Sequence, residues 1–244
     1  MLTHYPKNSL GHADHGWLKS KHHFSFANYY NPARMGFGTL RVVNDDWVAP
    51  GMGFGAHPHR NMEIISFIRS GAITHQDSMG NKGITEQGEV QVMSAGTGIV
   101  HSEYNRTNEP LTFYQIWIQS NKQDVPPRWE SKKFPTDVAN ELTLLVSGYA
   151  EDAGNTLFIN QQARIYGGKI AKGTTITQRI DHQAYVLASD GVFTVDDKSS
   201  VITMNKGDGA EVTHADFITL TATTECEIII IILSFFNSFI ILRK

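Results

Sequence analysis

The chain has very little cysteine, since Cys226 is the only one among its 244 residues. A single thiol excludes a disulfide framework within the chain and fits a reducing compartment, so we expect a cytoplasmic protein. The first ten residues also lack both the basic stretch and the apolar stretch of a secretory signal, and we expect none.

Strong charge and long apolar runs are scarce as well. The formal net charge is −3, which provides no overall basic surface, so we do not expect direct binding to nucleic acid. An apolar run at residues 228–242 is interrupted by Ser234, Asn237 and Ser238. It is shorter than the roughly twenty residues needed to cross a bilayer, so no membrane span is expected.

Short segments rich in β-branched and aromatic residues recur along the chain, separated by turns that contain glycine, proline or asparagine. This pattern predicts an all-β barrel or sandwich. Residues 1–23 are predicted to form a solvated arm or an edge strand, and the alternation FSFANYY at 24–30 predicts a further strand. The proline-rich, charged run at 124–135 is the best linker candidate, and after it the strand pattern starts again.

Two pairs of polar residues carry the candidate chemistry. His57 and His59 are two residues apart, and His101 and Glu103 repeat this spacing about forty residues later. Residues two apart on a strand point to the same face, so two neighbouring strands would bring three imidazoles and a carboxylate to one point. This donor set predicts a site for one divalent ion. It suits Fe(II), with Mn, Co, Ni, Cu and Zn as competitors, and no thiolate is available to select zinc.

The same residues carry a family resemblance. The stretch GFGAHPHRNMEI, the shorter HQDSMG and the later VQVMSAGTGIVHSE resemble the motifs of the pirin family, a branch of the cupins. Gly96 stands where many cupins have proline, a feature that pirins share. Pirins bind iron, so the resemblance implies Fe(II) at His57, His59, His101 and Glu103.

The resemblance also implies a fold of two cupin (jelly-roll) β-barrels in tandem. We expect an N-terminal metal-binding barrel over residues 1–130, a C-terminal cupin-like barrel over 131–233, and an atypical apolar tail over 234–244. Only His182 and His214 lie in the second half, and neither has a partner two residues away. Since a metal site needs several converging ligands, the second barrel is expected to bind no metal.

Three further side chains allow both a functional and a structural interpretation. Glu63 would share a strand face with His57 and His59 if the strand continued, and could then assist catalysis by orienting a ligand; plain packing of its stem explains it equally well. His75 and Asp77 also share a face, but Asp77 before Met79-Gly80 favours turn capping over a second site.

The resemblance implies a function, because pirins of this type are similar to quercetin 2,3-dioxygenases. Such an enzyme would use O2 to open the central ring of a flavonol, a small aromatic substrate, with Glu103 accepting the flavonol proton and Glu63 assisting. A second hypothesis is a metal-binding regulatory module that docks on a protein partner without turnover. A metal-storing or purely structural double barrel is the third.

Overall fold

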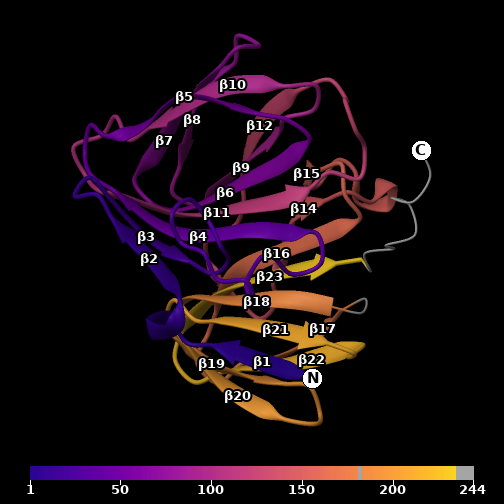
Figure 1. The fold of residues 1–244 in the computed structure, drawn as a ribbon. Helices are drawn as coiled ribbons and strands as arrows, with labels where there is room; N and C mark the ends of the chain where they lie inside the picture. The colour runs from indigo at the N-terminus through magenta and orange to yellow at the C-terminus, as the bar shows by residue number, and fades with distance from the viewer. Residues whose placement is uncertain (181–182, 235–244) are drawn as a thin grey trace.

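The computed structural model describes residues 1–180 and 183–234, and within them the prediction of an all-β fold of two tandem cupin barrels is confirmed (Figure 1). Each barrel combines one large sheet with one small sheet. Two single turns of 3-10 helix, η1 (Lys7–Ser9) and η2 (Ala150–Asp152), are the helical elements of this part of the chain.

The first barrel is drawn in purple in the upper half of Figure 1. Its large sheet contains, in spatial order, β12 (Arg128–Lys133), β9 (Glu89–Ser94), β6 (Met62–Ser70), β11 (Leu111–Gln119), β4 (Leu40–Val48), β3 (Leu18–His22) and β2 (Gly11–Asp14). Its small sheet contains β5 (Gly53–His59), β10 (Ile99–Tyr104), β7 (Ala72–Asp77) and β8 (Lys82–Glu86).

Most of the second barrel lies in the lower half of Figure 1, while β14 and β15 lie higher, at the level of β6 and β11. Its large sheet runs through β1 (Leu2–Tyr5), β21 (Gly209–Thr213), β18 (Gln183–Asp190), β23 (Cys226–Leu233), β16 (Ala163–Ile170), β14 (Thr143–Ser147) and β15 (Leu157–Phe158), with β13 (Val138–Ala139) paired to β16. Its small sheet contains β17 (Thr175–Arg179), β22 (Phe217–Ala222), β19 (Val192–Asp196) and β20 (Val201–Asn205).

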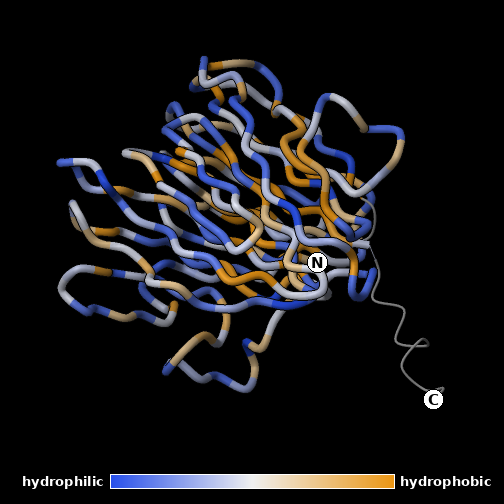
Figure 2. Tube along the Cα trace, turned by 90° about the horizontal axis from the view of Figure 1, so that it is seen from above, coloured by the Kyte–Doolittle hydropathy of each residue, from blue (hydrophilic) through white to orange (hydrophobic). Residues whose placement is uncertain are grey.

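The two large sheets pack face to face and share one apolar core, through which long hydrophobic stretches run in Figure 2. The core takes Ile65 and Ile116 from the first barrel and Ile229 and Ile231 from the second. Strand β23 is buried on both faces, because its alternate isoleucines, such as Ile230, enter the separate core inside the second barrel. A strand covered on both faces has no polar side, which explains the apolar sequence of β23 from Ile228 to Leu233.

Two local predictions differ from the structure, and a third agrees with it in part. The linker expected at 124–135 is wrong over Arg128–Lys133, because this segment forms β12 and pairs with β9. Of the two alternatives for residues 1–23, the edge strand is the one formed: β1 is the edge strand beside β21 of the second barrel, and β2 is the edge strand of the first barrel, paired with β3. The predicted strand at 24–30 is instead a tight turn held by an isolated bridge between Phe26 and Tyr29.

Gly96 marks a close approach of two loops. Its φ is 47°, and a Cβ added there would overlap the carbonyl oxygen of Val125. Any other residue would be strained at this positive φ and would overlap Val125. This gives a physical reason for glycine at a position where many cupins have proline.

Some predicted features fall outside the described residues. These are His182 and, apart from Ser234, the apolar tail of 234–244; His214 is exposed at the turn after β21. The absence of metal from the second barrel therefore stays a prediction, and so do the domain limits at residues 130 and 233. No helix in the described part of the chain has the length and apolarity to cross a membrane.

Candidate metal centre

The two histidine motifs lie on neighbouring strands. Strands β5 and β10 are antiparallel, and His101 stands directly opposite His57. His59 shares the face of His57, as the two-residue period of a strand requires. A β-bulge after His101 shifts the register, so that Glu103 stands opposite Phe54. The two neighbouring strands bring His57, His59 and His101 together.

The three imidazoles surround one point. Their ring centroids lie 4.4 Å (His57 to His101), 4.8 Å (His57 to His59) and 5.0 Å (His59 to His101) apart. One nitrogen from each ring lies within 4.8 Å of the others. His57 Nδ1 donates to the Gly55 carbonyl oxygen at 2.7 Å, which leaves its Nε2 free to bind an ion.

The state of these nitrogens fits a metal ion. Nε2 of His59 and both ring nitrogens of His101 are buried without a hydrogen-bond partner within the described chain. Burial, followed by the neighbouring histidines, lowers the pKa of His59 to about 4 and that of His101 to about 2. Both rings are therefore neutral near pH 7, and neutral imidazole is the form that binds metals. Unpartnered buried nitrogens are costly, and a bound ion would satisfy them.

Glu103 belongs to an adjoining group of candidate ligands, formed with His75 and His101. Its two carboxylate oxygens accept hydrogen bonds from Gln91 Nε2 at 2.6 Å and from Gln115 Nε2 at 2.9 Å. Burial raises the pKa of Glu103 to about 7, although both amides favour the charged form. The structure thus spreads the four predicted ligands over two groups that share His101.

His75 was missed as a possible ligand. Asp77 does cap the turn as predicted, because its Oδ1 accepts from the backbone nitrogens of Met79 and Asn81. Its other oxygen lies 2.9 Å from Nε2 of His75, a fully buried ring that stacks on Trp129. Burial lowers the pKa of His75, while Asp77 opposes this shift. The shared strand face of His75 and Asp77 was the relevant signal in the sequence. The sequence could not show that His75 lies close to Glu103.

Glu63 lies on a different sheet from His57 and His59. A turn at Arg60 and Asn61, where Asn61 has a φ of 50°, separates β5 from β6, so the continuous strand assumed for Glu63 is not formed. The buried Glu63 carboxylate accepts from Ser94 Oγ at 2.6 Å and from Asn160 Nδ2 at 3.4 Å. Neither group of candidate ligands includes it. Since Asn160 precedes β16, this carboxylate connects the two barrels.

This position leads to a prediction for the Glu63→Gln variant. Loss of the charged acceptor for Ser94 should lower the free energy of unfolding by about 1–3 kcal/mol, because hydrogen bonds to buried charged groups are strong. Metal content should stay at the wild-type level. Urea denaturation and metal analysis of the same sample measure the two effects, with Ser94→Ala as the matched variant. Loss of metal at unchanged stability would contradict the assignment.

A row of polar side chains forms the inner wall opposite the histidines. It crosses five adjacent strands of the large sheet through the paired positions His22, Asn44, Gln115, Ser66 and Gln91. Apolar clusters lie on either side of this row, one around Phe113 and the other around Ile64 and Met93. The row explains the alternation of Phe113, Gln115 and Trp117 on β11, since all three side chains face the barrel interior.

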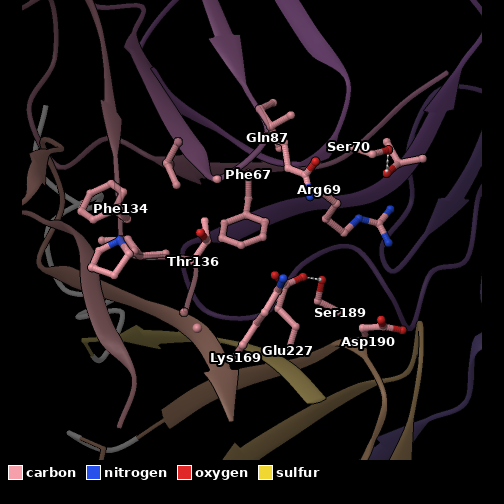
Figure 3. A pocket seen from close by; sticks show the side chains of 18 of the residues that line it. Phe67, Arg69, Ser70, Gln87, Phe134, Thr136, Lys169, Ser189, Asp190 and Glu227 are labelled. Carbon is pink, nitrogen blue, oxygen red and sulfur yellow. Dashed lines mark hydrogen bonds between the residues drawn. The ribbon is translucent and has the colours of Figure 1, made fainter. Parts of the chain in front are cut away.

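A cavity of about 360 Å³ lies elsewhere, between the two barrels (Figure 3). Phe67 and Phe134 line one side, and Lys169 and Glu227 line the other. None of the predicted site residues lines this cavity. The chemistry expected from the sequence is therefore located inside the first barrel rather than between the barrels.

Comparisons with known proteins agree with this architecture. The pirin family matches residues 4–118, and the quercetinase C-terminal cupin domain matches residues 144–233. A pirin-like protein of Caulobacter vibrioides is 45% identical, over 95% of this chain and 99% of that protein. A quercetin 2,3-dioxygenase of Escherichia coli K12 is 39% identical, over 91% of this chain and 94% of that protein.

A solved structure is also closely similar. The bacterial pirin YhhW of Escherichia coli, in complex with nickel(II), superposes with a TM-score of 0.89 at 37% sequence identity. The match covers 96% of this chain and 99% of that chain. Full-length relatives at this level of identity, together with the paired histidine strands and the two barrels, show that the chain belongs to the pirin family.

Proposed function

We propose that this protein is a metal-dependent dioxygenase that uses O2 to open the central ring of a flavonol such as quercetin. The observation that supports this most is the group of His57, His59 and His101, in which buried nitrogens of His59 and His101 have no hydrogen-bond partner among the described residues and His101 also belongs to the group that contains Glu103. The names of full-length relatives as quercetin 2,3-dioxygenases support the same reaction.

The ion is proposed to be Fe(II), held by His57, His59, His101 and Glu103. Three nitrogens and one carboxylate oxygen suit several first-row metals, and Mn, Co, Ni, Cu and Zn would compete for such a site. Bound there, iron would supply the Lewis acidity and redox chemistry that let O2 react with a flavonol anion, with up to two coordination positions left by four protein ligands.

The protein side chains have distinct tasks in this proposal. The histidines hold the ion, and the hydrogen bond from His57 to Gly55 keeps that ring in one orientation. Glu103 accepts the proton of the flavonol hydroxyl, and the amides of Gln91 and Gln115 hold its carboxylate in place. The apolar clusters around the polar row exclude water from the reacting ring.

The decisive experiment is anaerobic reconstitution with Fe(II), followed by quercetin and O2, with flavonol absorbance and dissolved oxygen recorded together. Both should fall in proportion. Glu103→Gln should retain part of the metal but lose more activity than metal, because it removes the group that takes the proton. If the loaded, folded protein consumes neither reactant, the flavonol proposal is wrong, and a metal-binding module that acts on a protein partner becomes the better hypothesis.

A further inference from the structure

A short aromatic turn follows β3 and lies over the first barrel. Phe26 and Tyr29 exchange both backbone hydrogen bonds, at 3.0 and 2.9 Å, and Ala27 between them has a φ of 50°. Ser25 Oγ donates to the Asn31 carbonyl oxygen at 2.9 Å and closes the turn at its base. The turn therefore has a defined shape and presents aromatic side chains in fixed directions.

Tyr29 anchors this turn to the edge of the large sheet. Its ring covers Gly11 of β2 so closely that a Cβ added to Gly11 would overlap it. The same ring stacks on His22 of β3, with centroids 6.2 Å apart and an interplanar angle of 21°. His22 is fixed in turn by Asn44, whose Oδ1 lies 2.8 Å from its Nδ1. The turn is thus attached to β2 and β3 through one side chain.

Phe26 extends from the anchored turn toward the metal centre. Its ring meets Trp117 edge to face, with centroids 5.5 Å apart and planes at 90°. Trp117 makes a similar contact with the candidate ligand His59, at 4.9 Å and 84°. Phe26 is only partly buried and belongs to none of the apolar cores in the described residues. Its contacts are with rings of the site rather than with the general core.

The location of these rings matches an unpaired seam of the barrel. Strand β5 ends the small sheet and β2 ends the large sheet, so neither has a partner on its outer side among the strands that the structure describes. An edge-to-face contact between Trp17 and Phe54 spans one part of the seam, with centroids 5.5 Å apart. The rings of Phe26 and Trp117 make a second set of contacts, which runs from the turn after β3 to His59 on β5. An aromatic substrate that reaches the histidines through this seam would meet them first.

We propose that Phe26 and Trp117 hold the pendant phenyl ring of the flavonol, which makes Phe26 a specificity-determining residue. This inference rests on the proposed function. In a flavonol the phenyl ring is attached to the carbon next to the one that bears the 3-hydroxyl. A hydroxyl directed at the His57, His59 and His101 group therefore brings the phenyl ring beside those ligands, where Trp117 and Phe26 offer edges and faces for aromatic contact.

The test compares two ligands on the nickel-loaded protein under anaerobic conditions, so that binding is measured without turnover. Quercetin carries the phenyl ring, whereas 3-hydroxychromone keeps only the 3-hydroxyl and the neighbouring carbonyl group and lacks the phenyl ring and the other hydroxyls. Phe26→Ala should weaken quercetin binding about tenfold, since one aromatic contact surface is removed, and should change 3-hydroxychromone binding less than about twofold. Phe26→Leu should fall between wild type and alanine.

Controls separate this role from a structural one. Tyr30 lies on the same turn but is 72% exposed, so Tyr30→Ala should bind both ligands like wild type. Gly11→Ala, which displaces Tyr29, should weaken quercetin selectively while nickel content stays unchanged. Equal weakening of both ligands by Phe26→Ala, or no weakening of quercetin, would overturn the inference while the proposed function stands. Wild-type protein that binds neither ligand would refute the proposed function, and this inference with it.

Discussion

Replacing His101 with alanine should abolish both metal binding and flavonol turnover. His101 is the one residue shared by both groups of candidate ligands, and neither of its buried nitrogens has another partner among the described residues. Removing it takes a ligand from the histidine group and also separates that group from Glu103. We expect metal affinity to fall more than about 100-fold, beyond the effect of losing an outer-shell partner.

Metal content after dialysis, measured by elemental analysis alongside quercetin turnover, tests this expectation. His214→Ala is the matched control, since His214 is an exposed histidine of the second barrel. That variant should keep one ion per chain and full activity. Because removal of His101 creates no new buried charge, the His101→Ala protein should remain folded. Retention of one tightly bound ion by folded His101→Ala would refute the assignment of the site.

Replacing Ile231 with alanine should lower the free energy of unfolding by about 2–5 kcal/mol, the range for truncating a buried isoleucine. Ile231 is fully buried on β23 and lies opposite Ile165 and Tyr185. It faces the core between the barrels, which also contains Ile65 and Ile116 of the first barrel. Since both barrels bury side chains in this core, they should unfold together. A substitution in one barrel should therefore destabilise the other.

Tryptophan fluorescence makes this coupling measurable. All four tryptophans, at positions 17, 47, 117 and 129, lie in or next to strands of the first barrel. In urea denaturation, the fluorescence midpoint of Ile231→Ala should therefore fall together with the midpoint from circular dichroism. Ile231→Val should cost only about 0.5–1.5 kcal/mol. Two separate transitions, with the fluorescence midpoint at its wild-type value, would show that the barrels are independent.

Sequence periodicity alone predicted which way the side chains of the main candidate ligands point. His57 and His59, like His101 and Glu103, are two residues apart. This spacing places each pair on one face of its strand, whichever strand it pairs with. The recurring β-branched segments likewise indicated an all-β fold. Both are local properties, because the two-residue period depends only on the extended backbone of each segment.

Other features depended on partners distant in the sequence. Glu63 has the parity expected of a residue beside His57 and His59, but a turn at Asn61 moves it to another sheet, where it bonds Ser94 and Asn160. FSFANYY has the alternation of a strand, yet its rings are needed for separate contacts: Phe24 enters the core between the barrels, while Phe26 meets Trp117.

Local patterns along the chain were therefore enough to predict the fold class, the histidine pairs and the side chains that share a strand face. Long-range packing was needed to bring Gln91 and Gln115 to Glu103, to place His75 beside that carboxylate, and to bury β23 in two cores. The physical reason is that backbone geometry sets where a side chain points within its own strand, whereas strand pairing and sheet packing over long sequence separations set what it meets there.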